Sequence, residues 1–125
     1  MKYVLLICAL VHSSFSWSMG TEFSYKDFHQ FLARSDTKFT MEMYAGGAFA
    51  AFAAANAKLT VKKEPLLFCM PPTLQMSPDM IIQQTEVQFK SLTSGMSAED
   101  RRSLAEEIPW GVFAMDALVR TFPCR

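Results

Sequence analysis

The sequence has few of the residues on which catalytic and metal sites usually depend. It contains 2 histidines and 3 cysteines in 125 residues, and one of each lies within residues 1–18. Once the two remaining cysteines are joined in a disulfide, His29 alone cannot form a Cys–His nucleophile pair or a zinc site. The neighbouring acids Glu99-Asp100 and Glu106-Glu107 do not face one another on a helix, which argues against a two-carboxylate acid/base pair. We therefore expect no catalytic residues, no metal, no cofactor and no enzymatic activity.

An excess of charge of either sign is also missing. The chain has 12 Lys and Arg against 12 Asp and Glu, whereas proteins that bind nucleic acid usually cluster an excess of basic charge. The basic pair Arg101-Arg102 is surrounded by acidic residues, as on an ordinary solvated helix face. The glycine pair Gly46-Gly47 has no Lys-Ser or Lys-Thr after it, so it is not a phosphate-binding loop. We expect no nucleic-acid partner.

The N-terminus has the pattern of a secretory signal. A basic start at Lys2 is followed by an apolar run over residues 3–11 and then by small serine residues. The run is shorter than the about 20 apolar residues that a membrane span requires. We predict a signal peptide over residues 1–18, a single mature domain over residues 19–125 with no membrane segment, and a periplasmic location. A cut after Ser16, and a eukaryotic secretory origin, remain alternatives.

Export brings the chain into an oxidising space, where cysteines pair. Two cysteines remain after the leader, Cys69 and Cys124, and we predict a disulfide between them. The bond would close a loop of 55 residues (124 − 69), which the chain-entropy description values at about 4 kcal/mol. The alternative is a pair of free reactive thiols, but neither cysteine has a nearby histidine or a Cys-X-X-Cys context.

The rest of the pattern predicts an all-α fold, a small bundle of about five helices. Serine caps at Ser24, Ser77 and Ser97 and a proline at Pro109 precede stretches with apolar residues at helical spacing. A fifth helix over residues 40–59 is small and apolar on nearly all sides, so we expect it to be central, with another backbone approaching its two glycines. Residues 60–76 are predicted to be a connector without a sheet.

Five short segments stand out in the C-terminal two thirds, and in chain order they are Tyr44-Ala45-Gly46-Gly47, Phe68-Cys69-Met70-Pro71, Ala98-Glu99-Asp100-Arg101, Ala117-Leu118 and Phe122-Pro123-Cys124. In this order they resemble the Rap/Tai family of immunity proteins. The resemblance covers roughly residues 40–125 and implies a small, periplasmic, all-helical protein. Members of that family bind and inactivate peptidoglycan amidase toxins delivered by type VI secretion, by occluding the active-site cleft and often as homodimers. Members often carry a further cysteine near the start of the glycine-containing helix, and residues 40–43 have none.

The resemblance implies a protein partner, a secreted peptidoglycan amidase, and it leaves the contact residues open. Loops can enter a cleft more easily than helices, so two turns are the candidate partner-binding loops. They consist of Lys62, Lys63 and Glu64, and of Thr93, Ser94, Gly95 and Met96.

Other functions remain open beside immunity. Residues 24–28 are reminiscent of an acid-stress chaperone of the HdeA type, although Tyr25 stands where that family has its first cysteine. A partner-binding periplasmic protein of unknown role and a small periplasmic enzyme are the further alternatives.

Overall fold

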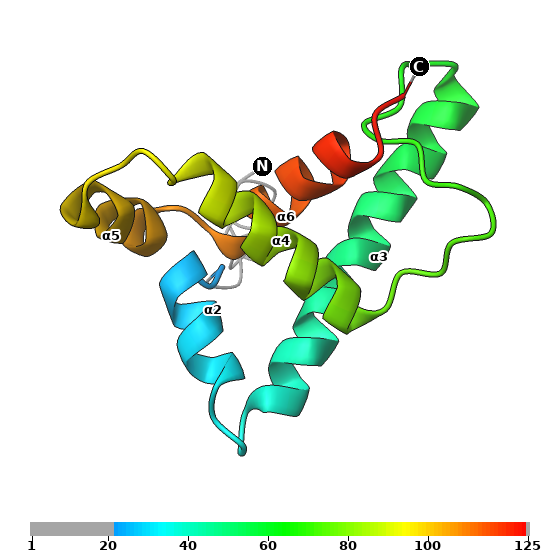
Figure 1. The fold of residues 1–125 in the computed structure, drawn as a ribbon. Coiled ribbons are helices and arrows are strands. Elements are labelled where there is room, and N and C mark those ends of the chain that lie inside the picture. The colour runs from blue at the N-terminus through cyan, green and yellow to red at the C-terminus, as the bar shows by residue number, and fades with distance from the viewer. Residues whose placement is uncertain (1–21, 125) are drawn as a thin grey trace, which may run out of the picture.

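Five helices make up most of the described part of this computed structural model, residues 22–124 (Figure 1). Besides the helices, these residues contain a single isolated β-bridge between Ser24 and Pro109. The predicted all-α fold is therefore confirmed, while the predicted signal peptide over residues 1–18 lies outside the described residues. The helices are α2 (Tyr25–Leu32), α3 (Lys38–Lys62), α4 (Pro78–Leu92), α5 (Ala98–Glu107) and α6 (Trp110–Thr121).

Serine side chains begin three of the helices, as the sequence predicts. The hydroxyl of Ser24 accepts a hydrogen bond from the backbone N–H of Asp27 at 3.1 Å, and that of Ser97 accepts one from Asp100 at the same distance. Ser77 caps α4 in the same way through the N–H of Met80 at 3.3 Å. Each cap satisfies one of the amide groups that a helix start leaves without a partner.

The core lies where α2, α4 and α6 meet, and it is largely aromatic. Trp110 and Phe28 are fully buried and stacked, with ring centroids 4.3 Å apart. Tyr25 is stacked on Phe89 at 3.8 Å, and Phe113 meets both of these rings edge-on. Helix α4 packs against both α3 and α6, so it forms the middle of the bundle.

The prediction of a central helix over residues 40–59 is wrong. Met41 and Ala45 are the buried residues of α3, and beyond Ala45 each of its residues is at least partly exposed. Figure 1 shows α3 running along one side of the molecule and past the other helices. Alanine side chains are too short to fill a core by themselves, and the aromatic residues of α2, α4 and α6 fill it instead. No helix within residues 22–124 is long and apolar enough to cross a membrane.

The expected close approach of another backbone to the two glycines of α3 is also wrong. A Cβ added at Gly46 would lie 3.4 Å from the ring of Pro78, which is ordinary contact with a side chain, and one added at Gly47 would meet nothing within 4 Å. The helix also runs further than predicted, because no glycine or proline occurs between Leu59 and Pro65. It ends at Lys62, and Lys63 takes the left-handed conformation (φ 58°) that closes many helices.

The predicted disulfide joins Cys69 in the α3–α4 connector to Cys124 after α6, with Cα atoms 5.0 Å apart. The backbone N–H of Cys69 also donates a 2.7 Å hydrogen bond to the carbonyl of Phe122. From the other side, the side-chain amide of Asn56 on α3 donates to the carbonyl of Phe68 at 2.6 Å and accepts from the N–H of Leu67 at 2.9 Å. The connector, the C-terminal segment and the outer half of α3 are thereby held together.

Candidate functional site

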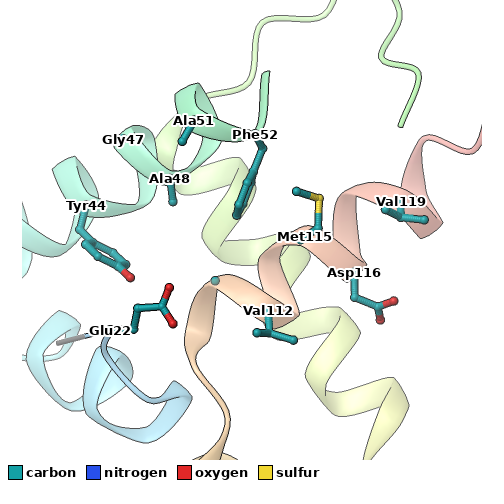
Figure 2. A pocket seen from close by; sticks show the side chains of 11 residues that line it. Glu22, Tyr44, Gly47, Ala48, Ala51, Phe52, Val112, Met115, Asp116 and Val119 are labelled. Atoms are coloured by element: carbon teal, nitrogen blue, oxygen red, sulfur yellow. The ribbon is translucent and has the colours of Figure 1, made fainter. Parts of the chain in front are cut away.

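An open apolar groove of about 880 Å³ lies between α3 and α6. Figure 2 shows the two helices facing each other, with Phe52 of α3 and Met115 of α6 pointing toward one another between them. The remaining walls are formed mainly by small or aliphatic residues, and two of these, Val112 and Val119, are 54% and 38% exposed. The lining residues are Glu22, Tyr44, Gly47, Ala48, Ala51, Phe52, Gly111, Val112, Met115, Asp116 and Val119.

The groove exists because the two helices that form its walls, α3 and α6, both pack against α4 and do not pack against each other. Helix α4 packs extensively on α6 and on α3, whereas α3 and α6 are not among the helix pairs in substantial contact. On the α3 side the lining is kept shallow by Gly47, Ala48 and Ala51. The outcome is an open hollow in a place where larger side chains would have closed the bundle.

A carboxylate lies at each end of the groove, and one of them, Asp116, is paired with Arg120. Glu22 lies near Tyr44 at one end and Asp116 lies near Val119 at the other (Figure 2). Burial, and to a smaller extent the carboxylate of Glu22, raises the pKa of Tyr44, so its hydroxyl stays protonated at neutral pH. Asp116 accepts hydrogen bonds from Gln88 Nε2 and from Arg120 Nε. Among the lining residues there is no lysine, arginine or histidine.

His29 lies away from the groove, in an aromatic setting. Its ring is 4.4 Å from that of Tyr25, and its Nε2 atom is buried without a hydrogen-bond partner within the described structure. Burial lowers the pKa of His29, the carboxylate of Glu86 opposes that change, and Lys90 adds to it. Burial also raises the pKa of Tyr25 to about 12, with a smaller contribution from Glu86. Both side chains are therefore neutral at pH 7, and this cluster acts as part of the packing.

The two predicted partner-binding turns lie far apart. Figure 1 places the end of α3 and the turn between α4 and α5 on opposite sides of the molecule. At the first turn Lys62 belongs to the last turn of α3, and Lys63 and Glu64 are exposed. Because of this separation, the two turns do not form one continuous contact surface.

The second turn is only partly accessible. Thr93 is 2% exposed, and its hydroxyl donates to the carbonyl of Phe89 at 2.9 Å, so its side chain offers no surface to a partner. Ser94, Gly95 and Met96 are exposed. Their role in partner binding stays a prediction.

Metal ligation has no candidate in the described part of the chain. Within residues 22–124, no group of three or more His, Cys, Asp or Glu side chains is arranged to hold an ion. Both cysteines of this part are used in the disulfide.

Comparisons with known proteins give no relative. No family model matches the chain, no curated protein matches it in sequence, and no solved structure matches it in fold. The Rap/Tai resemblance therefore rests on the segments quoted from the sequence.

Sequence reasoning missed the groove, although a signal for it is present. Val112, Met115 and Val119 recur at helical spacing on α6, on a different side from the stripe of Trp110 and Phe113 that enters the core. One apolar stripe on α6 packs in the core, so a second stripe on the same helix indicates a further apolar face. Together with the alanine-rich face of α3, it makes two apolar faces that no other segment within residues 22–124 covers.

Proposed function

We propose that this chain is a periplasmic immunity protein that binds and inhibits a peptidoglycan amidase delivered by type VI secretion, by covering the active-site cleft of the toxin. The observation that supports a binding role most directly is the open apolar groove between α3 and α6. Large exposed apolar hollows on a small domain are typical of sites where another molecule docks. Inhibition of this kind requires a surface that is complementary to the toxin, and it requires no reactive group on the inhibitor.

The class of partner comes from the resemblance to the Rap/Tai family. Two of the matching segments, far apart in sequence, meet in space: Cys69 is bonded to Cys124, and the backbone N–H of Cys69 donates to Phe122. A covalent joint between these segments gives a physical reason for both to occur in one chain. It supports the view that the order of the segments reflects a shared architecture.

A pulldown with the leader-free protein, residues 19–125, against periplasmic extract and secreted effectors tests the proposal. We expect recovery of a cell-wall hydrolase and loss of its amidase activity when the purified proteins are mixed in equal amounts. Retrieval of no hydrolase from a sample that contains the effector repertoire would contradict the immunity function. Protection of many unrelated proteins at strongly acidic pH, without a specific partner, would favour the chaperone alternative.

A further inference from the structure

The length of the groove limits what can occupy it. Its lining extends over residues 44–52 on α3 and over residues 111–119 on α6. Eight residue steps of an α-helix rise about 12 Å, which is roughly two turns. An occupant that uses the whole groove therefore matches about two turns of helix.

The width of the groove suits the close approach of such a helix. The α3 wall presents Gly47, Ala48 and Ala51, and a Cβ added at Gly47 would meet no atom within 4 Å. Small residues on one helix allow another to pack at the short end of the usual 8–10 Å axial separation. Opposite them, Met115 supplies a flexible side chain that adapts to the shape of its neighbour.

The charges of the groove specify the polar part of the occupant. Carboxylates lie at both ends, Glu22 and Asp116, but Asp116 is already paired with Arg120 at 3.0 Å. Glu22 makes no ion pair within residues 22–124, so it is the charge that a partner can meet. A fatty acid or another amphiphilic anion with its head group at this end would bring a second negative charge next to Glu22. An occupant with an apolar middle and a basic residue at the Glu22 end complements both the apolar walls and the unpaired carboxylate of the groove.

We propose that the groove between α3 and α6 docks about two turns of an amphipathic helix from another protein. The helix places its apolar side chains between Phe52 and Met115 and a lysine or arginine beside Glu22. Anchoring residues at positions i, i+3 or i+4, and i+7 are the usual pattern when a helix binds in a groove. The inference deepens the proposed function, and rests on it, in assigning this helix to the inhibited amidase.

Leucine at position 47 is the most direct test, because it fills the groove without disturbing the fold. Gly47→Leu adds a side chain where the structure has open space and replaces glycine by a better helix former, so its melting temperature should be no lower than that of the native protein. The matched control is Ala50→Leu, which adds leucine to the same helix at an exposed position outside the lining. At about 100° per residue, position 50 lies about 60° from position 47 around the helix axis and about 160° from the lining residues Ala48 and Phe52, so its side chain points out of the groove.

The probe is a fluorescent synthetic peptide that forms an amphipathic helix, with leucines at i, i+3, i+4 and i+7 and lysines at both ends. A second peptide has glutamate in place of each lysine. We expect the basic peptide to bind the native protein and the Ala50→Leu variant equally, and the Gly47→Leu variant at least about ten-fold more weakly, which corresponds to about 1.4 kcal/mol. The acidic peptide should bind the native protein more weakly than the basic one, and Glu22→Gln should reduce that difference.

Equal binding of the basic peptide to both leucine variants, or no binding to any of them, would overturn the inference. Self-association of the native protein in sedimentation equilibrium that Gly47→Leu abolishes would overturn it in favour of a second copy of the chain as the occupant. Binding of peptide to residues 19–125 but not to the full chain would assign the groove to the leader segment instead and would equally overturn it.

A pulldown with the same two variants separates this inference from the proposed function. If the native protein and both variants recover a cell-wall hydrolase equally well, the groove is not the docking site and the immunity function stands. If none recovers a hydrolase while the basic peptide still distinguishes Gly47→Leu from Ala50→Leu, the docking surface stands and the immunity function fails.

Discussion

Replacing Asn56 by alanine should detach the α3–α4 connector from α3. The side-chain amide of Asn56 makes two hydrogen bonds to the connector, one from the N–H of Leu67 and one to the carbonyl of Phe68. Phe68 is 3% exposed, so its carbonyl lies beside a buried side chain, whereas Leu67 is 42% exposed and water can reach its amide more easily. The loss of the Asn56 side chain therefore lowers the free energy of unfolding more through the Phe68 carbonyl than through the Leu67 amide.

The expected loss of stability follows from these two environments. A buried polar group left without a partner costs about 1–3 kcal/mol, so we assign about 2 kcal/mol to the Phe68 carbonyl. The more exposed Leu67 amide loses an ordinary hydrogen bond, which contributes about 1 kcal/mol. Alanine is a better helix former than asparagine by roughly 0.6 kcal/mol, which offsets part of the loss. The net destabilisation of Asn56→Ala is about 2 kcal/mol, or about 10 °C in melting temperature for a domain of this size.

Urea and thermal unfolding followed by circular dichroism, with the disulfide intact, measure this difference. Lys58→Ala is the control, because Lys58 is exposed on the same helix and makes no ion pair within the described residues. It should change the free energy of unfolding by less than about 0.5 kcal/mol. An Asn56→Ala protein as stable as the control would refute the reasoning, since it would mean that water satisfies both connector groups equally well.

Three further changes test other parts of the structure. Replacing Cys69 and Cys124 by serine should lower the free energy of unfolding by about 4 kcal/mol, and a native protein whose urea midpoint does not move on adding reductant would contradict this. Ser77→Ala should cost about 1 kcal/mol by removing the cap of α4, and Ser77→Asp should restore most of it in the same unfolding assay. Burial lowers the pKa of His29 in the folded state, so the unfolded state takes up its proton first as pH falls. Stability should therefore decline as pH falls through about 6.5, the ordinary histidine pKa, and His29→Phe should remove that part of the decline; a native melting temperature constant from about pH 7.5 to pH 5 would argue against a buried neutral histidine.

The parts of the fold that sequence reasoning predicted correctly depend on short-range chemistry. Ser24, Ser77 and Ser97 each cap a helix through an amide three residues later, a pattern contained within four residues. The disulfide could be predicted because residues 19–125 contain two cysteines, which allow a single pairing within that range.

The parts that could not be predicted depend on which helices reach one another. The apolar character of α3 predicts a central helix, but the burial of a helix depends on which side chains from other helices pack around it. The centre of the bundle is occupied by Trp110 and Phe28 instead. The sequence predicts the end of this helix at residue 59, whereas α3 ends at Lys62. The true end is hard to predict because Lys63 adopts a left-handed conformation that is ordinarily taken by glycine. The groove follows from the spacing between α3 and α6, which no local pattern encodes.

The bond between Cys69 and Cys124 closes a covalent ring that contains α4, α5 and α6, while α2 and α3 remain outside it. A protease that nicks any turn inside this ring leaves a single molecule, because both fragments stay tethered through sulfur. A nick between α2 and α3 lies outside the ring, so no covalent bond retains the N-terminal helix and packing alone can hold it. Digestion under oxidising conditions followed by electrophoresis with and without reductant would therefore show which turns are cleaved. Cleavage in the loop around Asp36, or in residues 63–68 before Cys69, gives two separate pieces even without reductant.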